Sequence, residues 1–257
     1  MVGIMQNIIV VVNQKGGVGK TTSVVNLASG LSKAKKKVLL IDMDPQANAT
    51  TGSGIEKHSL KVSIYDVLLG YVSITDAIIK SPTCGYDVLP SNRNLAGSEI
   101  ELVNMNNREY RLRDVVNIIK DQYDIILIDC PPSLSLLTLN GLATSNHLLV
   151  PIQCEYYALE GLTDLLNTVA KLKDRINPGL NLLGVVRTMF DKRNNLANQV
   201  SQQLQQHFND KLFKVSIPRN VRLAEAPSFG MSAITLDDST IGAKAYISLT
   251  RELLKRL

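Results

Sequence analysis

The sequence lacks tryptophan, is poor in aromatic residues and has only three cysteines among its 257 residues. Cys84, Cys130 and Cys154 are odd in number, lie in apolar stretches and form no Cys-x-x-Cys pair, which argues against a disulfide framework and a zinc site. We therefore expect a reducing, cytoplasmic compartment. Residues 1–7 lack the basic region of a signal peptide, and no apolar run approaches the roughly 20 residues of a membrane span.

A large excess of one charge is also absent. The sequence carries 28 basic and 23 acidic residues, which give a formal net charge of +5. Such a mild basic excess permits a polyanionic partner without requiring one.

Short β-branched runs alternate along the chain with longer segments of helical period, which predicts an α/β fold. The expected strands are 7–13, 37–42, 86–90, 123–129, 147–152 and 180–186, and the expected helices are 21–34, 63–69, 94–119, 134–145, 157–176 and 194–208. Residues 125–128 and 182–186 are apolar throughout, as in strands buried on both faces. We expect residues 1–257 to form a single domain with a mostly parallel, twisted sheet flanked by helices on both faces, and ligands to bind beyond the carboxyl ends of its strands.

The closing segment, residues 239–257, has the pattern of an amphipathic helix. Its apolar stripe consists of Ile241, Ala245, Leu249, Leu253 and Leu257, which are four residues apart. We expect this helix to pack against the domain. A membrane-surface helix is the alternative, and it requires the stripe to be free.

A glycine-rich turn follows the first expected strand and opens the first expected helix. Its sequence is Lys15, Gly16, Gly17, Val18, Gly19, Lys20, Thr21 and Thr22. The N–H groups of such a turn and of the helix N-terminus converge on an anion. As in a P-loop, Lys20 is placed to reach the β- and γ-phosphates of a nucleotide, and the Thr21 hydroxyl to ligate Mg²⁺. The general P-loop pattern fails at Gln14, where it has glycine, and the dinucleotide-binding pattern fails at Thr22.

This turn resembles the deviant Walker A motif of the ParA/MinD superfamily of P-loop ATPases, in which Lys15 corresponds to the signature lysine. The stretches "PIQCEYYALEGL" and "RTMFD" also resemble chromosomal ParA proteins of the Soj type, so the resemblance covers nearly the whole chain. It implies that ATP and Mg²⁺ are the cofactors and that the ATP-bound form is a homodimer in which Lys15 reaches the partner's nucleotide. A triphosphate between Lys15 and Lys20 would offset the repulsion of their ammonium groups.

Three aspartates follow expected strands. Asp42 and Asp44 come after the second strand, and Asp129 ends a later one. Buried carboxylates are costly unless paired, and a magnesium nucleotide is a suitable partner. Asp129 is interpreted as the Walker B carboxylate, which holds Mg²⁺ through a water. By resemblance, Asp44 is the catalytic aspartate that acts on the attacking water, and Asp42 contacts the water shell of the metal. We expect slow intrinsic hydrolysis, because no arginine finger is evident in the same chain.

Residues 217–230 have no regular period and follow a short strand-like run, 212–217. The resemblance implies that this segment passes the adenine, with Pro218 and Asn220 in contact with ATP. An ordinary proline-rich connection is the alternative interpretation.

The resemblance also implies that the dimer binds double-stranded DNA without sequence preference and associates with the nucleoid. Arg193 and Arg222 correspond to the arginines used in Soj-type proteins, and Lys192, Arg219 and Lys244 are candidates for the same patch. Such binding depends on phosphate neutralisation and weakens with salt. Without the resemblance, scattered arginines indicate only a solvated surface.

The function implied is ATP-dependent DNA partitioning, in chromosome or plasmid segregation, with hydrolysis stimulated by a ParB-like partner and with no stable membrane association. A MinD-like, membrane-associated division-site ATPase is one alternative. A metabolic P-loop enzyme of the dethiobiotin synthetase type is another, and it requires a small-molecule pocket. Since only about six residues precede the first strand, we expect no N-terminal DNA-reading domain. Cys130 is interpreted as a packing residue rather than an iron–sulfur ligand.

Overall fold

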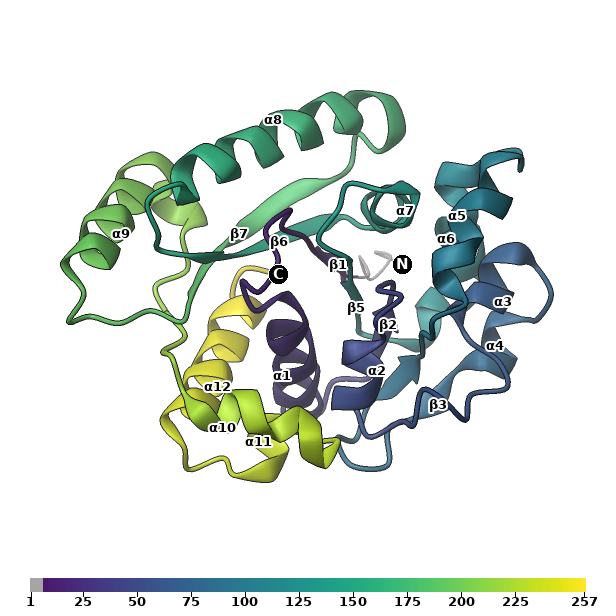
Figure 1. The fold of residues 1–257 in the computed structure, drawn as a ribbon, viewed down its shortest axis with the longest axis horizontal. Helices are drawn as coiled ribbons and strands as arrows, with labels where there is room; N and C mark the ends of the chain where they lie inside the picture. The colour runs from purple at the N-terminus through teal and green to yellow at the C-terminus, as the bar shows by residue number, and fades with distance from the viewer. Residues whose placement is uncertain (1–6) are drawn as a thin grey trace, which may run out of the picture.

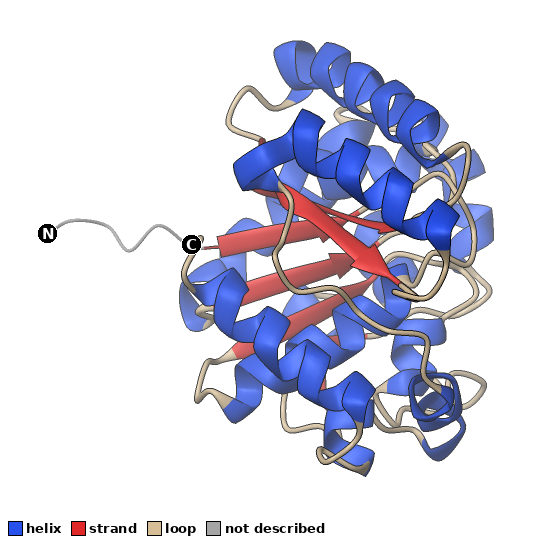
Figure 2. Ribbon diagram, turned by 90° about the vertical axis from the view of Figure 1, so that its left-hand side faces the viewer, coloured by secondary structure: helices blue, strands red, loops and turns tan. Residues whose placement is uncertain are grey.

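In the computed structural model, which describes residues 7–257, a sheet of seven strands runs through the middle of the molecule (Figure 1, Figure 2). The strand order is β3-β4-β2-β5-β1-β6-β7, and all neighbours are parallel except β3 and β4. The strands are β1 (Asn7–Val11), β2 (Val38–Asp42), β3 (Ile79–Lys80), β4 (Asp87–Leu89), β5 (Ile125–Asp129), β6 (His147–Gln153) and β7 (Asn181–Thr188). This confirms the expected fold and all six expected strands; the predictions for residues 1–6 lie outside the described residues.

Two hydrophobic cores lie on opposite faces of the sheet. Successive side chains of β1 alternate between them, since Ile8 and Val10 belong to one core and Ile9 and Val11 to the other. The first core is covered by α3 (Ile64–Leu69), α4 (Ile74–Ala77), α5 (Leu95–Val103), α6 (Arg111–Ile119), α7 (Leu136–Thr144), α8 (Ala158–Ile176) and α9 (Asn195–Phe208). The second is covered by α1 (Lys20–Lys33), α2 (Asn48–Gly52), α10 (Val221–Glu225), α11 (Ala233–Leu236) and α12 (Ile241–Leu254). Figure 1 shows α8 above the sheet and α1 and α12 below it.

The expected helix over 94–119 is wrong in its middle. The chain forms α5 and α6 with a short 3-10 turn, η1 (Arg108–Tyr110), between them. Asn107, which precedes η1, has a φ of 55°, a left-handed conformation that asparagine tolerates but that a helix cannot continue through. The side chain of Asn140 fixes the new start, because its amide donates to Arg108 O (2.8 Å) and accepts from Leu112 N (3.0 Å). The break therefore depends on a residue of α7, distant in the sequence.

The prediction that the closing helix packs against the domain is confirmed, but its predicted apolar stripe is wrong in part. Ile241 is 72% exposed, and Leu257 lies beyond the end of α12. The buried apolar face instead consists of Ala243, Tyr246, Leu249 and Leu253. A spacing of four residues drifts around a helix of 3.6 residues per turn, so a buried face follows alternating steps of three and four. This face belongs to the second core and is covered.

The strand-like run 212–217 does not form a β-strand of the sheet. Within residues 7–257 its strand-type pairing is limited to two isolated bridges, from Leu212 to Val185 and from Pro218 to Phe190. Three short 3-10 turns complete the described chain, η2 (Lys120–Gln122), η3 (Asn209–Lys211) and η4 (Ala226–Phe229).

Candidate nucleotide and magnesium site

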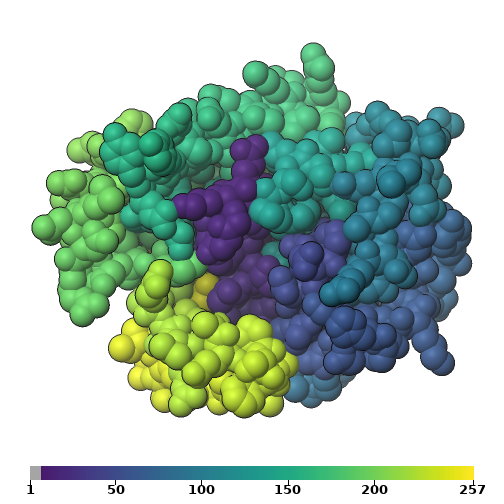
Figure 3. Space-filling model, viewed as in Figure 1, coloured from purple at the N-terminus to yellow at the C-terminus, as the bar shows by residue number. Residues whose placement is uncertain are grey.

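The glycine-rich turn lies at the carboxyl end of β1, in the middle of the sheet. Gly17 and Gly19 have φ values of 75° and 83°, which disfavour any residue with a side chain. A Cβ added at Gly16 or Gly17 would meet nothing within 4 Å, so one side of the turn is open. The buried Val18 anchors the turn, since its carbonyl accepts a hydrogen bond from the Thr188 hydroxyl (2.7 Å) at the end of β7. Figure 3 shows the start of the described chain, in purple, reaching the surface at the centre of this face.

Lys20 is the first residue of α1 and is largely buried, with 7% of its surface exposed. Its ammonium group donates to the carbonyl of Lys15 (3.1 Å) and so closes the turn. Burial lowers the pKa of the Lys20 ammonium, an effect that the nearby carboxyl groups of Asp129 and Asp44 oppose. A cation at a helix N-terminus is unfavourable with respect to the helix dipole, and an anion bound at this turn would compensate for it.

The Lys15 side chain points to a different partner. Its ammonium group forms an ion pair with the carboxylate of Glu155, which follows β6, and both side chains are 55% exposed. Exposed ion pairs of this kind contribute between about 0 and 1 kcal/mol. Lys15 is therefore weakly held in the single chain. Glu155 has no assigned role in our sequence analysis, although its place directly after a strand of the sheet is a signal that could have identified it.

Two carboxyl groups are buried side by side at the ends of neighbouring strands. Asp42 on β2 pairs in register with Asp129 on β5, and both residues are fully buried. Burial, with the proximity of Asp42 second, raises the pKa of Asp129 well above its usual value. Burial also raises the pKa of Asp42 to about 6, although the Thr50 hydroxyl (2.7 Å) and backbone N–H (2.8 Å) donate to its carboxylate. Within residues 7–257 neither carboxyl group forms an ion pair, although the Lys20 ammonium is near enough to oppose part of the rise in the pKa of Asp129.

The oxygen atoms at this point fit a hydrated magnesium ion. The Thr21 hydroxyl donates to one oxygen of Asp129 (2.7 Å), and the other oxygen of that carboxyl group, Oδ1, is buried without a hydrogen-bond partner among residues 7–257. Within residues 7–257 there is no group of three or more His, Cys, Asp or Glu that could hold a metal by itself. Mg²⁺ commonly binds one or two protein oxygens together with waters and substrate phosphates, so a sparse donor set beside a phosphate turn suits it.

Asp44 lies on the loop after β2 and faces the same space. It is 9% exposed, and its Oδ1 accepts a hydrogen bond from Gln46 N (2.9 Å), which makes a turn around Pro45. Ser91 holds the backbone of this loop through a bond from its hydroxyl to Asp44 O (2.8 Å). The electrostatic influence of Asp44 reaches both Lys20 and Asp129. The structure thus brings the five predicted residues Lys20, Thr21, Asp42, Asp44 and Asp129 to one edge of the sheet.

Comparison with known proteins agrees with this geometry. A family model described as an AAA domain matches residues 6–182. The sporulation initiation inhibitor protein Soj of Bacillus subtilis is 49% identical over 249 residues, which are 97% of this chain and 98% of that one. The chromosome partitioning protein ParA of Myxococcus xanthus is 48% identical, with 97% and 88% covered.

The chain belongs to the ParA/Soj family of P-loop ATPases.

Solved structures give the ligands of this fold. A Mycobacterium smegmatis protein, described as cobyrinic acid a,c-diamide synthase with bound ATP analogue and magnesium, has a TM-score of 0.85 and 34% identity, over 98% of this chain and 95% of that one. The cell-division ATPase MinD of Pyrococcus furiosus has a TM-score of 0.82 and 26% identity, over 98% and 100%. ATP and Mg²⁺ are accordingly the cofactors of this ParA/Soj family member. Among residues 7–257, no helix combines the length and the apolar character needed to cross a membrane.

A cavity, which we call the base cavity, adjoins the phosphate turn of the ParA/Soj chain. It has a volume of about 250 Å³ and extends from Gly19 and Thr22 to the predicted base contacts Pro218 and Asn220. In the part of the chain that the structure describes, the Asn220 side-chain oxygen is buried without a hydrogen-bond partner. Such an oxygen can accept from the amino group of adenine, so the cavity suits the predicted contact. Sequence reasoning missed Met189, which lines the cavity with a φ of 49° that is rare for a side chain of its size.

An open groove of about 760 Å³, which we call the cation groove, lies next to the base cavity. It is lined by Lys192, Arg193, Lys214, Arg219 and Lys244. Four of these are residues of the predicted patch, whereas Lys214 was not predicted. The fifth member of that patch, Arg222, does not line the groove; it forms an ion pair with Glu225 (3.1 Å) on α10.

Arg193 is 90% exposed and forms an ion pair with Asp191 (2.8 Å). This bond lowers the pKa of the Asp191 carboxyl group to about 2. A phosphate must therefore compete with Asp191 for the Arg193 guanidinium group.

Cys130 follows Asp129 and is fully buried in the first core, with its thiol next to Gly141. Burial raises its pKa well above the usual value. The thiol is therefore held neutral in packed surroundings, and the interpretation as a packing residue fits its place in the structure.

Proposed function

We propose that this chain is a partitioning ATPase whose ATP-bound form is a homodimer that binds double-stranded DNA without sequence preference. The observation that supports it most directly is the arrangement of Lys20, Thr21 and Asp129 around an open glycine turn, with Lys15 available outside it. In the proposed reaction, Lys20 and the turn bind the β- and γ-phosphates, and Thr21 and Asp129 hold hydrated Mg²⁺. The metal supplies charge neutralisation to the phosphates when bound.

Asp44 is the residue we assign to the attacking water, because it lies beside Lys20 and, among residues 7–257, its carboxyl group accepts a hydrogen bond only at Oδ1. Phosphoryl transfer is catalysed chiefly by positioning and electrostatics, so Asp44 needs to orient the water rather than attack the phosphate. Asp42, buried behind it, contacts the water shell of the metal. Lys15 leaves Glu155 and reaches the nucleotide of the second subunit.

The cation groove supports the DNA part of the proposal. A duplex carries a phosphate about every 1.7 Å along its axis, and lysine and arginine side chains bind it by displacing counterions. We assign Arg193 and Arg219, which line the groove with Lys192 and Lys244, to the DNA contact. We also assign Arg222 to it, which lies outside the groove on α10 and must leave Glu225 to bind a phosphate. A ParB-like partner that stimulates hydrolysis completes the proposed cycle, in the cytoplasm and on the nucleoid.

Three variants test this scheme by size-exclusion chromatography and DNA retention, each with and without Mg-ATP. Lys20→Ala should abolish nucleotide binding, because the main cation at the phosphates is removed. Asp44→Ala should accumulate the ATP-bound dimer on DNA, because hydrolysis stops after binding. Arg222→Ala should dimerise normally and lose DNA retention at least about tenfold. A wild-type protein that stays monomeric with Mg-ATP, or an Arg222 variant that retains DNA fully, would contradict the scheme.

The M. smegmatis protein keeps a small-molecule enzyme as a second candidate, because its description names a metabolic synthase. That function predicts substrate-dependent ADP release without DNA. The similarity to MinD makes a membrane-associated division-site ATPase the third candidate. That function predicts co-sedimentation with liposomes, and not with DNA, in the presence of ATP. We favour partitioning, since the ParA and Soj relatives are 48% and 49% identical, whereas the two solved structures are 34% and 26% identical.

A further inference from the structure

Residues 212–220, which we call the strap, run beside β7 with few backbone bonds to it. Phe213 N donates to Val185 O (2.9 Å), Ile217 N donates to Arg187 O (2.8 Å), and Phe190 N donates to Ile217 O (2.9 Å). The stretch between Phe213 and Ile217 bulges away from the strand. Its backbone groups must find other partners or remain unpaired.

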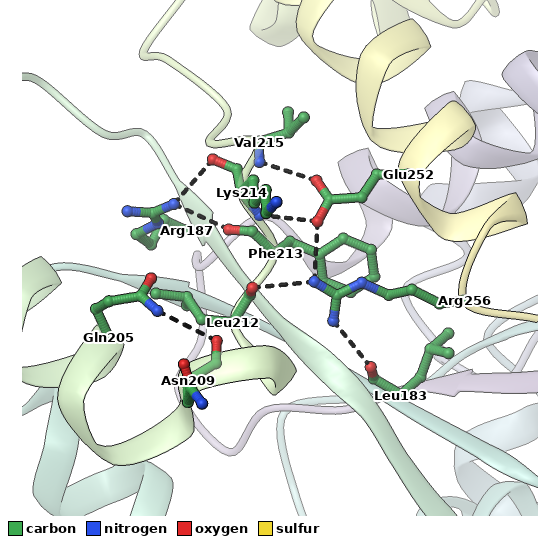
Figure 4. Close-up of polar contacts among 10 residues, drawn as sticks. All are labelled: Leu183, Arg187, Gln205, Asn209, Leu212, Phe213, Lys214, Val215, Glu252 and Arg256. Atoms are coloured by element: carbon green, nitrogen blue, oxygen red, sulfur yellow. Dashed lines mark hydrogen bonds and ion pairs between the residues drawn. The ribbon is translucent and has the colours of Figure 1, made fainter.

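Side chains from β7 and α12 supply those partners (Figure 4). The Glu252 carboxylate accepts from the backbone N–H groups of Lys214 (2.9 Å) and Val215 (3.0 Å). The Arg187 guanidinium donates to the carbonyls of Phe213 (2.9 Å) and Lys214 (3.0 Å). The strap is thus clamped on both its donor and its acceptor sides.

Arg256 adds a third attachment. Its guanidinium donates to Leu212 O (3.0 Å) and Glu252 (2.9 Å) and lies 3.8 Å from the centre of the Phe213 ring. The Glu252 side chain is 17% exposed. Burial alone would raise its pKa, but the N–H groups of the strap and Arg256 outweigh burial, and the pKa lies below its usual value. Glu252 therefore stays ionised at neutral pH and binds the strap through charge-assisted hydrogen bonds.

The strap forms the wall between the two cavities described above. Ile217 and Asn220 line only the base cavity, Lys214 lines only the cation groove, and Pro218 and Arg219 line both. A shift of this wall changes both cavities at once. The phosphate turn is attached elsewhere, through Val18 and Thr188, and does not bond to the strap's clamp.

We propose that Glu252 is a positioning residue which, through the strap, couples the base cavity to the cation groove within one subunit. A nucleotide whose base occupies the cavity fixes Pro218 and Arg219, and with them the cation spacing of the groove. Such coupling is reciprocal, so a polyanion in the groove strengthens base binding by the same factor. This inference rests on the proposed base cavity. It adds Glu252, which lies about 30 positions after Asn220 in the chain and does not line the cavity but binds the strap.

The test compares Mg-ATP with magnesium tripolyphosphate, which has the phosphates but no base, by calorimetry on the full chain. Glu252→Gln should weaken Mg-ATP about tenfold, because the amide offers one acceptor where two N–H groups need one each. Tripolyphosphate affinity should change less than about twofold. Asp174→Asn, which neutralises an exposed carboxylate on α8, is the matched control and should change neither ligand.

Glu252→Asp keeps the charge with a shorter side chain, so it should recover part of the lost ATP affinity and serve if the Gln variant does not fold. A duplex DNA titration with Mg-ATP should show the same order of variants. Equal losses for both phosphate ligands, or no loss for ATP, would overturn the coupling while leaving the proposed ATPase intact. A wild-type chain that binds tripolyphosphate as tightly as ATP would instead remove the base cavity itself.

Discussion

Among the described residues of the site, Asp129 has a carboxyl group whose hydrogen-bonding capacity is left partly unused. One of its oxygens is buried without a hydrogen-bond partner in the described structure, and its pKa lies well above the usual value because of burial and the neighbouring Asp42. A raised carboxyl pKa means that the folded state binds more protons than the unfolded state. Its contribution to stability is therefore complete below the unfolded pKa, close to 3.8, and is lost as the pH rises toward the folded value. The nucleotide-free protein gives up stability to keep a site ready for a cation.

Asp129→Asn should consequently stabilise the nucleotide-free protein at neutral pH. The amide oxygen still accepts from Thr21, and the group at position 129 no longer has to be kept protonated or left charged beside the buried Asp42. We expect a gain of roughly 1–3 kcal/mol in the free energy of unfolding at pH 7 to 8, which disappears below about pH 4, together with loss of magnesium-dependent ATP binding. Urea unfolding across this pH range measures it, with Asp174→Asn as the control. A variant less stable than wild type at pH 8 would contradict this, because it would show that the attraction between Lys20 and the Asp129 carboxylate outweighs the cost of burying that carboxylate.

Individual site residues can be predicted from the sequence where the bound group requires certain residue types at short, fixed distances along the chain. The turn from Lys15 to Thr22 and the aspartates after β2 and β5 could be predicted because a phosphate needs those residue types within a few positions. Thr188, Lys214 and Glu252 could not be identified in this way, since each acts on a segment distant in the chain, and only the folded arrangement shows the contact.

Among the elements, α1 and α12 pack at unusually close range. A Cβ added at Gly30 of α1 would lie 2.2 Å from Thr250 Oγ1 and 3.1 Å from Thr250 Cβ on α12. The glycine therefore lets the two helices approach, at a cost of about 1 kcal/mol in helix propensity. Glu252 also belongs to α12 and accepts from the strap, so the contact between α1 and α12 helps to fix the position of the Glu252 side chain relative to the strap.

Gly30→Ala should thus destabilise the protein by about 1–3 kcal/mol despite the better helix propensity of alanine. Thr250→Ala in the same chain should recover part of the loss, because it removes the hydroxyl that the new methyl group meets. Gly97→Ala in α5, where nothing lies within 4 Å, should instead stabilise by up to about 1 kcal/mol. Thermal unfolding of the wild type, Gly30→Ala, Thr250→Ala, their double variant and Gly97→Ala measures these differences. Additive effects of Gly30→Ala and Thr250→Ala would mean that the helices do not meet at this pair.

The predictions for strands succeeded because each strand packs through its own apolar run, and two other segments were predicted wrongly because a distant side chain decides their structure. The apolar stripe of the closing helix was wrong for another reason, since a spacing of four residues drifts around the helix. The six strands follow from their apolar runs, because a parallel sheet is buried on both faces. The break inside 94–119 depends on Asn140 of α7, and the irregular strap depends on Arg187 and Glu252. Neither β7 nor α12 signals in its own sequence that it will bind the backbone of another segment.

At the scale of the whole molecule, the phosphate turn, the base cavity and the cation groove follow one another along the carboxyl edge of the sheet toward β7. Thr22 and Gly19 link the turn to the base cavity, and Pro218 and Arg219 link that cavity to the groove. The net charge of +5 is too small to bind DNA by itself, so the local density of cations in the groove matters more than the total. In the proposed dimer, two grooves act on one duplex.

Lys192→Gln removes one cation from each groove and should therefore flatten the salt dependence of DNA binding. The slope of log affinity against log salt should fall by about 1.8 for the dimer, since each phosphate contact contributes about 0.9. Lys80→Gln, at the opposite edge of the sheet on β3, changes the total charge equally and should leave the slope as it is. Fluorescence anisotropy with a short duplex, Mg-ATP and a range of salt concentrations gives both slopes. Equal flattening in the two variants would indicate that total charge, and not the groove, attracts the DNA.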